Sequence, residues 1–146
     1  MSRSPGEPLP TTVARLVADA NRIVPPLPLD RARPLLDDPT VRFVDIREPQ
    51  EWTREGIIPG AYRAPRGMLE FWIDPDSPYY RAGLDDGRRL ILYCGSAWRS
   101  ALAAESLSRM GLDTVTHLEG GFSAWRDAGH PVEPYSPPPP RPEPDA

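Results

Sequence analysis

A run of apolar residues, Leu90 to Tyr93, is followed by a loop of mostly small residues and then by a helix-like stretch from Ser100 to Met110. A short apolar run of this kind is typical of a buried strand, and the stretch after it has apolar residues at helical spacing. The loop between them, residues 94–99, directs several backbone N–H groups toward one point. We call it the Cys94 loop. Strand, loop and helix in this order favour an α/β fold.

Cys94 begins this loop and Arg99 ends it. Backbone N–H groups, a helix N-terminus and a nearby cation all favour the ionised form of a thiol, so we expect a nucleophilic thiolate at Cys94. An inert, buried cysteine is the alternative, but Cys94 ends the apolar run instead of lying within it. Arg99 is interpreted as a clamp for an anionic substrate or as a structural arginine paired with a carboxylate.

The residues inside the loop are expected to hold the substrate through their backbone N–H groups; they are Gly95, Ser96, Ala97 and Trp98. The Trp98 ring either lines the pocket or covers its rim. Ser100 either donates its hydroxyl to the sulfur or caps the helix that follows. The sequence therefore predicts an anion-binding site built around one thiol.

The rest of the chain alternates between strand-like and helix-like segments. Strands are predicted at Val41 to Ile46, Ala61 to Ala64, Leu90 to Tyr93 and Thr114 to Leu118, with at most an edge strand in Pro25 to Leu29. Short helices are predicted at Leu29 to Leu36 and Pro49 to Arg54, and a last turn of helix carries Phe122 and Trp125. In the helix after the Cys94 loop, Ala103, Leu107 and Met110 form the expected inner face. This order predicts a mostly parallel central sheet of about five strands with helices on both faces.

The two ends of the chain are expected to differ from this central part. Residues 1–10 are predicted to be a disordered N-terminus, and residues 11–24 an amphipathic helix that packs on the domain or on a second subunit in a homodimer. Residues 25–133 form the expected single domain. The proline-rich segment 134–146 lacks apolar residues and is predicted to be a disordered tail.

Composition excludes several kinds of site and partner. A net charge of −4 and a pI near 5.2 offer no general attraction for nucleic acid or anionic lipid. A single cysteine forms neither an internal disulfide nor a cysteine zinc site. No run approaches the roughly 18 apolar residues that span a bilayer. We therefore expect a cytoplasmic protein without a metal, an organic cofactor or a membrane partner.

Three segments together resemble the rhodanese family. They are VDIREPQEWTREGIIPGA at Val44 to Ala61, LILYCGSAWRSALAAESLSRMG at Leu90 to Gly111, and HLEGGFSAW at His117 to Trp125. The resemblance implies a single-domain rhodanese-like fold in which the Cys-x-x-x-x-Arg loop carries a persulfide. Many relatives have Gly where this chain has Ala97, and alanine pays about 1 kcal/mol or more for the left-handed conformation that Gly adopts freely.

The resemblance also implies a reaction and its partners. Cys94 would take a sulfane sulfur from a small anionic donor such as thiosulfate and pass it to a thiol or to cyanide, without a cofactor. The segment that follows the second predicted strand would lie beside the site, where Arg66 either attracts anionic donors or is an ordinary solvated arginine. Within the first signature, Asp45 is expected to bind loop N–H groups and Arg47 to pair with Glu51.

Two other interpretations stay open at this point. A cysteine-dependent phosphatase or arsenate reductase would also use a thiolate and an arginine, but those enzymes have five residues between Cys and Arg, and this chain has four. A non-catalytic rhodanese-type module that binds or senses a ligand is the other alternative. His117 and His130 lack partners at metal-ligand or triad spacing and are predicted to be ordinary hydrogen-bonded or exposed residues.

Overall fold

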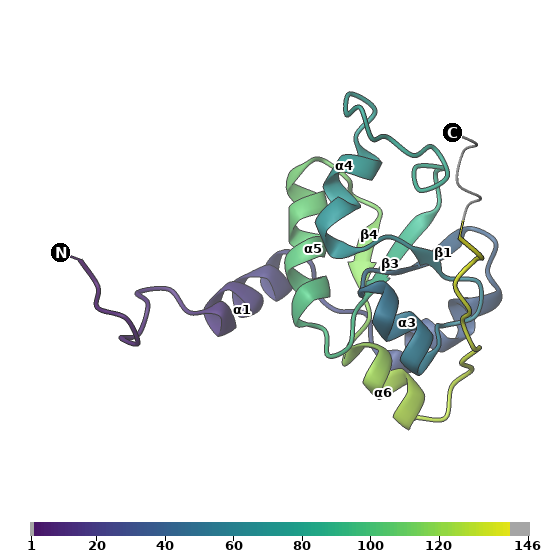
Figure 1. The fold of residues 1–146 in the computed structure, drawn as a ribbon, viewed down its shortest axis with the longest axis horizontal. Helices are drawn as coiled ribbons and strands as arrows, with labels where there is room; N and C mark the ends of the chain where they lie inside the picture. The colour runs from purple at the N-terminus through teal and green to yellow at the C-terminus, as the bar shows by residue number, and fades with distance from the viewer. Residues whose placement is uncertain (1, 141–146) are drawn as a thin grey trace.

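The computed structural model describes residues 2–140 (Figure 1). The helices are α1 Val13–Ile23, α2 Leu29–Ala32, α3 Pro49–Glu55, α4 Leu69–Ile73, α5 Trp98–Arg109 and α6 Gly121–Asp127, with 3-10 turns η1 at Arg33–Asp37 and η2 at Arg66–Met68. The strands are β1 Val41–Asp45, β2 Tyr62–Arg63, β3 Arg89–Tyr93 and β4 Val115–His117. Within the described part of the chain, no helix is long and apolar enough to cross a membrane.

The sheet is parallel throughout and has the strand order β2-β1-β3-β4. β1 and β3 pair along their whole length, from Val41 opposite Arg89 to Asp45 opposite Tyr93. The sheet thus has four strands where about five were predicted. Leu27 forms only a single parallel bridge beside β4, because the prolines around it have no N–H to continue the ladder.

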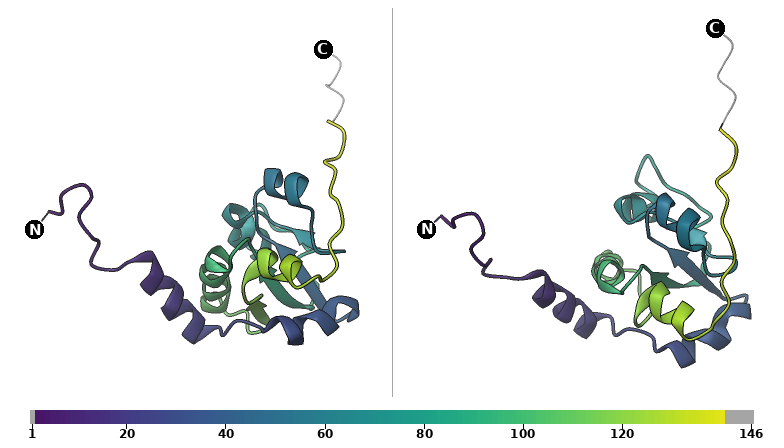
Figure 2. Two further views of the ribbon diagram at one scale, coloured as in Figure 1. Left: turned by 90° about the horizontal axis from the view of Figure 1, so that it is seen from below. Right: turned by 60° about the horizontal axis from the view of Figure 1, so that its bottom comes forward.

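Alternate residues of each central strand pack into two different clusters. Leu90 and Leu92 of β3 lie on the face covered by α4 and α5, and Ile91 and Tyr93 lie on the face covered by α2, η1 and α6. Figure 2 shows this arrangement, with helices on both sides of the sheet. The predicted α/β architecture is confirmed. Met110 is an exception to the predicted inner face of α5, because it is exposed at the helix end.

Helix α1 contacts α5 near the C-terminal end of α1, and the rest of α1 projects away from the domain (Figure 1). Val17 and Ala20 are buried against Ala101, whereas Val13 and Leu16 of the same helix are exposed. Thr12 caps the helix by accepting from the Arg15 N–H at 3.1 Å. The apolar stripe of α1 is therefore only half covered within one subunit, and the predicted homodimer through this helix stays a prediction.

The chain after α6 returns across α3. Glu133 exchanges two backbone hydrogen bonds with Ile57, each of 2.9 Å. Two residues further on, the Tyr135 ring meets Trp52 edge to face at 5.6 Å between ring centroids. The proline-rich segment thus begins packed on the domain and then runs away from it (Figure 2). Residues 141–146 of the predicted tail lie outside the described residues.

Candidate active site

Cys94 continues the alternation of β3. Because Leu90 and Leu92 face α5, the side chain two positions on also points to that face, and Cys94 packs in the same cluster. The Cys94 loop then turns back to start α5 at Trp98. Ala97, just before the helix, adopts the left-handed conformation with φ 77° and ψ 0°. Ala97 therefore adopts the left-handed conformation that glycine usually adopts in such a loop, at a steric cost of about 1 kcal/mol or more.

Helix α6 holds the carbonyl side of the Cys94 loop. Phe122 N–H donates to the Cys94 carbonyl at 2.7 Å, and Ser123 N–H donates to the Gly95 carbonyl at 3.1 Å. Gly121 permits this approach, since a Cβ there would lie 2.7 Å from both carbonyl oxygens. With its carbonyls bound to α6, the loop turns the Ala97 N–H toward the sulfur.

The sulfur is enclosed by polar groups of the loop and of α5. Ala97 N–H donates to Cys94 Sγ at 3.2 Å, and the thiol contacts the Ser100 hydroxyl at an S–O distance of 3.7 Å. Cys94 is only 1% exposed. An N–H group at the start of a helix stabilises a negative charge on sulfur, so this geometry suits a thiolate or a persulfide.

Arg99 lies at the mouth of the loop and is bound to helix α3. Its guanidinium donates to both carboxylate oxygens of Glu51, at 2.8 and 3.0 Å. This hydrogen bonding raises the pKa of Arg99, with a smaller contribution from Cys94, and lowers the pKa of Glu51 to about 2. Gly95 leaves room for the arginine, since a Cβ there would lie 3.3 Å from Nη2. The Arg99 side chain remains 43% exposed and accessible to an anion.

The predicted pairing of Arg47 with Glu51 is wrong. Arg47 is fully buried and donates to Asp45, to Glu55 and to the Gly56 carbonyl. Its guanidinium lies over the Phe122 ring, 4.1 Å from the ring centroid. Asp45 was expected to bind N–H groups of the Cys94 loop, but it accepts the Arg47 backbone N–H at 3.0 Å instead. This cluster orders the turn from β1 to α3, and it leaves Glu51 free for Arg99.

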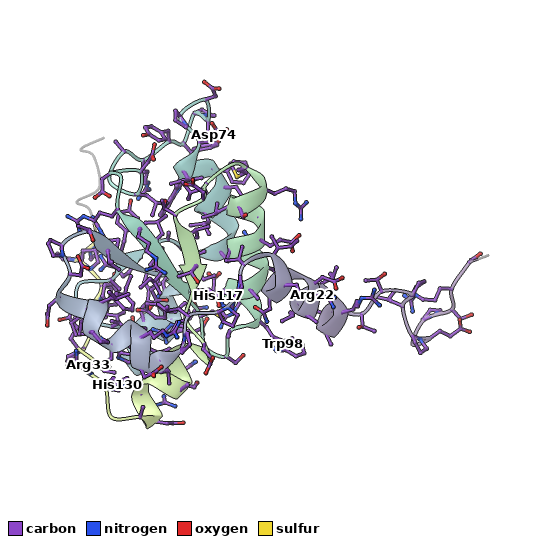
Figure 3. The ribbon with its side chains drawn as sticks, turned by 180° about the vertical axis from the view of Figure 1, so that it is seen from behind. Arg22, Arg33, Asp74, Trp98, His117 and His130 are labelled. Carbon is purple, nitrogen blue, oxygen red and sulfur yellow. The ribbon has the colours of Figure 1, made fainter. Side chains whose placement is uncertain are left out.

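The remaining predicted site residues differ in position. Ser96 and Trp98 are exposed at the outer edge of the Cys94 loop, and Trp98 projects from it in Figure 3. Arg66 forms an ion pair with Glu70 at 2.6 Å, and Glu70 also accepts from Ser106. Arg66 is thus paired with a carboxylate of α4, as Arg99 is with one of α3, and its side chain is 30% exposed, compared with 43% for Arg99.

His117 was not predicted as a site residue, yet the structure places it behind Ser100. Its Nδ1 lies 3.1 Å from the Ser100 hydroxyl, and its Nε2 lies 2.7 Å from Asn21 Oδ1 of α1. Burial lowers the pKa of His117 to about 4. The sequence feature that could have identified His117 is its place at the carboxyl end of β4. The carboxyl ends of neighbouring parallel strands meet at one edge of a sheet, where Cys94 also lies.

The sequence around these groups matches a known protein family. Residues 29–128 match the Rhodanese-like domain family. The chain belongs to this family. A sulfurtransferase of Allochromatium vinosum is 33% identical over 98 residues, which cover 67% of this chain and 83% of that protein. An uncharacterized protein of Synechocystis is 37% identical over 92 residues, and the match spans 63% of this chain and only 46% of that relative. These similarities support an enzyme of the rhodanese kind.

A solved structure extends the similarity of this rhodanese-like chain beyond the family match. It is a Rhodopseudomonas palustris protein of unknown function, described as a possible tyrosine phosphatase. The two share 42% identity with a TM-score of 0.84 over 89% of this chain and the whole of that one. The shared fold therefore includes part of the chain outside residues 29–128.

Proposed function

We propose that this protein is a sulfurtransferase that carries a sulfane sulfur as a persulfide on Cys94. The observation that carries the proposal is the Ala97 N–H group, which points at Sγ from the start of α5 at 3.2 Å. A donor at that position favours negative charge on Sγ before loading, and again when Cys94 leaves as the thiolate. The sulfurtransferase named among the relatives gives independent support.

The reaction has two displacement steps. The Cys94 thiolate attacks the outer sulfur of thiosulfate, an S–S bond forms, and the bond to the sulfite sulfur breaks, so that sulfite leaves with the electron pair. An acceptor thiolate or cyanide then attacks the outer sulfur of the persulfide. Cys94 leaves as the thiolate, ready for another donor.

Arg99 would bind the oxygens of the donor. Its guanidinium is a planar, permanently charged donor of hydrogen bonds and is held in place by Glu51. Because the side chain is partly exposed, it can exchange a carboxylate contact for a contact with the incoming anion. Ser100, on the other side of the sulfur, would donate its hydroxyl to the charged sulfur.

A non-catalytic binding module is the second candidate, and the burial of Cys94 favours it. At 1% exposure, the sulfur meets a donor only if side chains at the mouth of the loop move aside. Phosphatase chemistry has weaker support. The phosphatase description belongs to the Rhodopseudomonas palustris protein, and a loop with four residues between Cys and Arg encloses a phosphoryl group less readily than one with five.

Mass spectrometry of the purified protein after incubation with thiosulfate tests the three candidates. We expect a gain of one sulfur atom at Cys94 and release of thiocyanate when cyanide is added. Arg99→Ala should lower turnover by ~10²–10³-fold, and Arg54→Ala, at an exposed arginine of α3, should leave it unchanged. No gain of sulfur, with or without hydrolysis of p-nitrophenyl phosphate, would contradict the proposal.

A further inference from the structure

A buried chain of polar contacts connects Cys94 to helix α1. It runs from Cys94 Sγ to Ser100 Oγ at 3.7 Å, from Ser100 Oγ to His117 Nδ1 at 3.1 Å, and from His117 Nε2 to Asn21 Oδ1 at 2.7 Å. Ser100 and His117 are 0% and 1% exposed. We call these four residues the Cys94 relay. Figure 3 shows His117 on the side of the sheet where α1 joins the domain.

The directions of the hydrogen bonds in this relay depend on each other. A neutral imidazole carries one N–H, so one ring nitrogen donates and the other accepts. When Nε2–H donates to Asn21 Oδ1, Nδ1 accepts the Ser100 hydroxyl proton, and the Ser100 oxygen faces the sulfur as an acceptor. That order suits a thiol, which donates its own S–H to Ser100. It does not suit an anionic sulfur, which needs a donor.

The opposite order suits the anion. With the proton on Nδ1, the ring donates to the Ser100 oxygen, and the Ser100 hydroxyl donates to the sulfur. Nε2 then needs a donor, and the Asn21 amide supplies an N–H when it turns over, because its oxygen and nitrogen have nearly the same shape. Asn21 is half-buried on α1. It is the residue that allows His117 to be paired in both orders.

We propose that His117 and Asn21 are positioning residues that turn the Ser100 hydroxyl toward the Cys94 sulfur when this sulfur is a thiolate. The ring loses its proton at Nε2 and gains one at Nδ1 by exchange with water, so its net charge does not change. The inference rests on the proposed function, because it describes how the same site would stabilise its anionic states. Asn21 lies outside the residues that match the family, so this contribution comes from the N-terminal helix.

The remaining features of the site are consistent with a neutral ring. Burial lowers the pKa of His117, and no charged side chain is among the causes. The charged groups on the other side of the sulfur are Arg99 of α5 and, paired with it, Glu51 of α3. Neither belongs to the relay, so variants at Asn21 and His117 leave both in place.

Nitrogen-15 NMR of the full chain tests the order directly, since the chain has two histidines and the chemical shifts distinguish the two tautomers. We expect the Nδ1–H tautomer at His117 once ultraviolet absorbance shows the Cys94 thiolate, and the Nε2–H tautomer in Cys94→Ala under the same conditions. His130, which lies against Trp125 instead, should be the same in both samples and is the internal control.

Three results would overturn the inference. One is an Nε2–H ring at His117 beside an ionised Cys94, another is an imidazolium there, and the third is a thiol that stays protonated up to ~pH 10, well above the ordinary range for cysteine. None of these measurements needs a sulfur donor. Failure of the proposed function would appear instead as the correct tautomer change without any gain of sulfur from thiosulfate.

Two substitutions at His117 separate positioning from packing. In His117→Asn the amide can occupy the place of Nδ1 and still donate to Ser100, whereas His117→Leu fills the space without a donor. We expect the rate of Cys94 alkylation by iodoacetamide at neutral pH to fall by about tenfold in His117→Leu and by much less in His117→Asn. Equal losses, or a larger loss in His117→Asn, would indicate a packing role and contradict the proposal.

Discussion

Glu51 and Arg99 join helix α3 to helix α5 through two parallel hydrogen bonds at the mouth of the Cys94 loop. The two residues are separated by 48 positions in the sequence, so their contact depends on the fold. A paired arrangement of this kind fixes the plane of the guanidinium. It gives the site a cation whose orientation is set before an anion arrives.

Glu51→Gln should remove a pH-dependent part of the stability. Arg99 lowers the pKa of Glu51 from 4.5 to about 2, so the carboxylate stabilises the folded state above pH 4.5 and loses this contribution as the pH falls toward 2. Because Arg99 is partly exposed, we expect a difference of only about 1 kcal/mol at pH 7. Urea unfolding at several pH values measures it. A difference that stays constant down to the lowest pH would contradict the assignment of this effect to the ion pair.

His117 should cause a separate loss of stability as the pH falls, in a higher pH range than the loss caused by Glu51. Burial lowers its pKa from 6.5 to about 4, so the neutral ring favours folding above pH 6.5, and this advantage disappears as the pH falls from 6.5 to 4. Since the side chain is buried, we expect wild type to lose about 2–3 kcal/mol relative to His117→Asn over this range. The comparison again uses urea unfolding. Parallel stability curves for the two proteins would show that His117 is not responsible.

Ala97→Gly should stabilise the protein. Ala97 has φ 77°, and glycine adopts this conformation without the steric cost that alanine pays, although it loses more entropy on folding. We expect a net gain of about 0.5–1 kcal/mol in the free energy of unfolding. Ala101→Gly, within the helix that follows, should do the opposite. If Ala97→Gly destabilises the protein, as Ala101→Gly is expected to do, the left-handed conformation of Ala97 is not a source of strain and the prediction is wrong.

Gly121→Ala should damage the Cys94 loop itself. The new Cβ would lie 2.7 Å from the carbonyl oxygens of Cys94 and Gly95, at a φ of 68°. We expect a loss of at least about 2 kcal/mol in stability and slower alkylation of Cys94, because the loop must move. Gly129→Ala is the matched control, since its φ is 77° and no atom lies within 4 Å of the added Cβ. Equal effects of the two changes would show that backbone strain alone accounts for them.

The central part of the fold was predictable because its signals are local. The run Leu90 to Tyr93 is buried on both faces, as a central strand of a parallel sheet should be, and it became β3. The place of Cys94 between this strand and α5 followed from the same short segment. The edge of the sheet was harder to predict, since Leu27 and its neighbouring prolines make a bridge too short to count as a strand.

The partners of the polar residues were not predictable in the same way. Arg47 was expected to pair with Glu51 across one helical turn, but its side chain is fully buried and pairs with Asp45 and Glu55. His117 and Asn21 lie 96 positions apart, and their contact exists only because α1 packs on α5. Such contacts cannot be predicted from sequence spacing. Knowing which strands are neighbours in the sheet would predict some of them.

The contact between α1 and α5 also bears on how this protein is to be produced in the laboratory. A shortened gene that starts at residue 29, where the family match begins, would encode all of the sheet and the whole Cys94 loop. It would lack the α1 residues that pack against Ala101 and the Asn21 amide that faces the His117 ring. If the Cys94 relay acts as proposed, cysteine reactivity measured on such a trimmed protein should differ from that of the full chain.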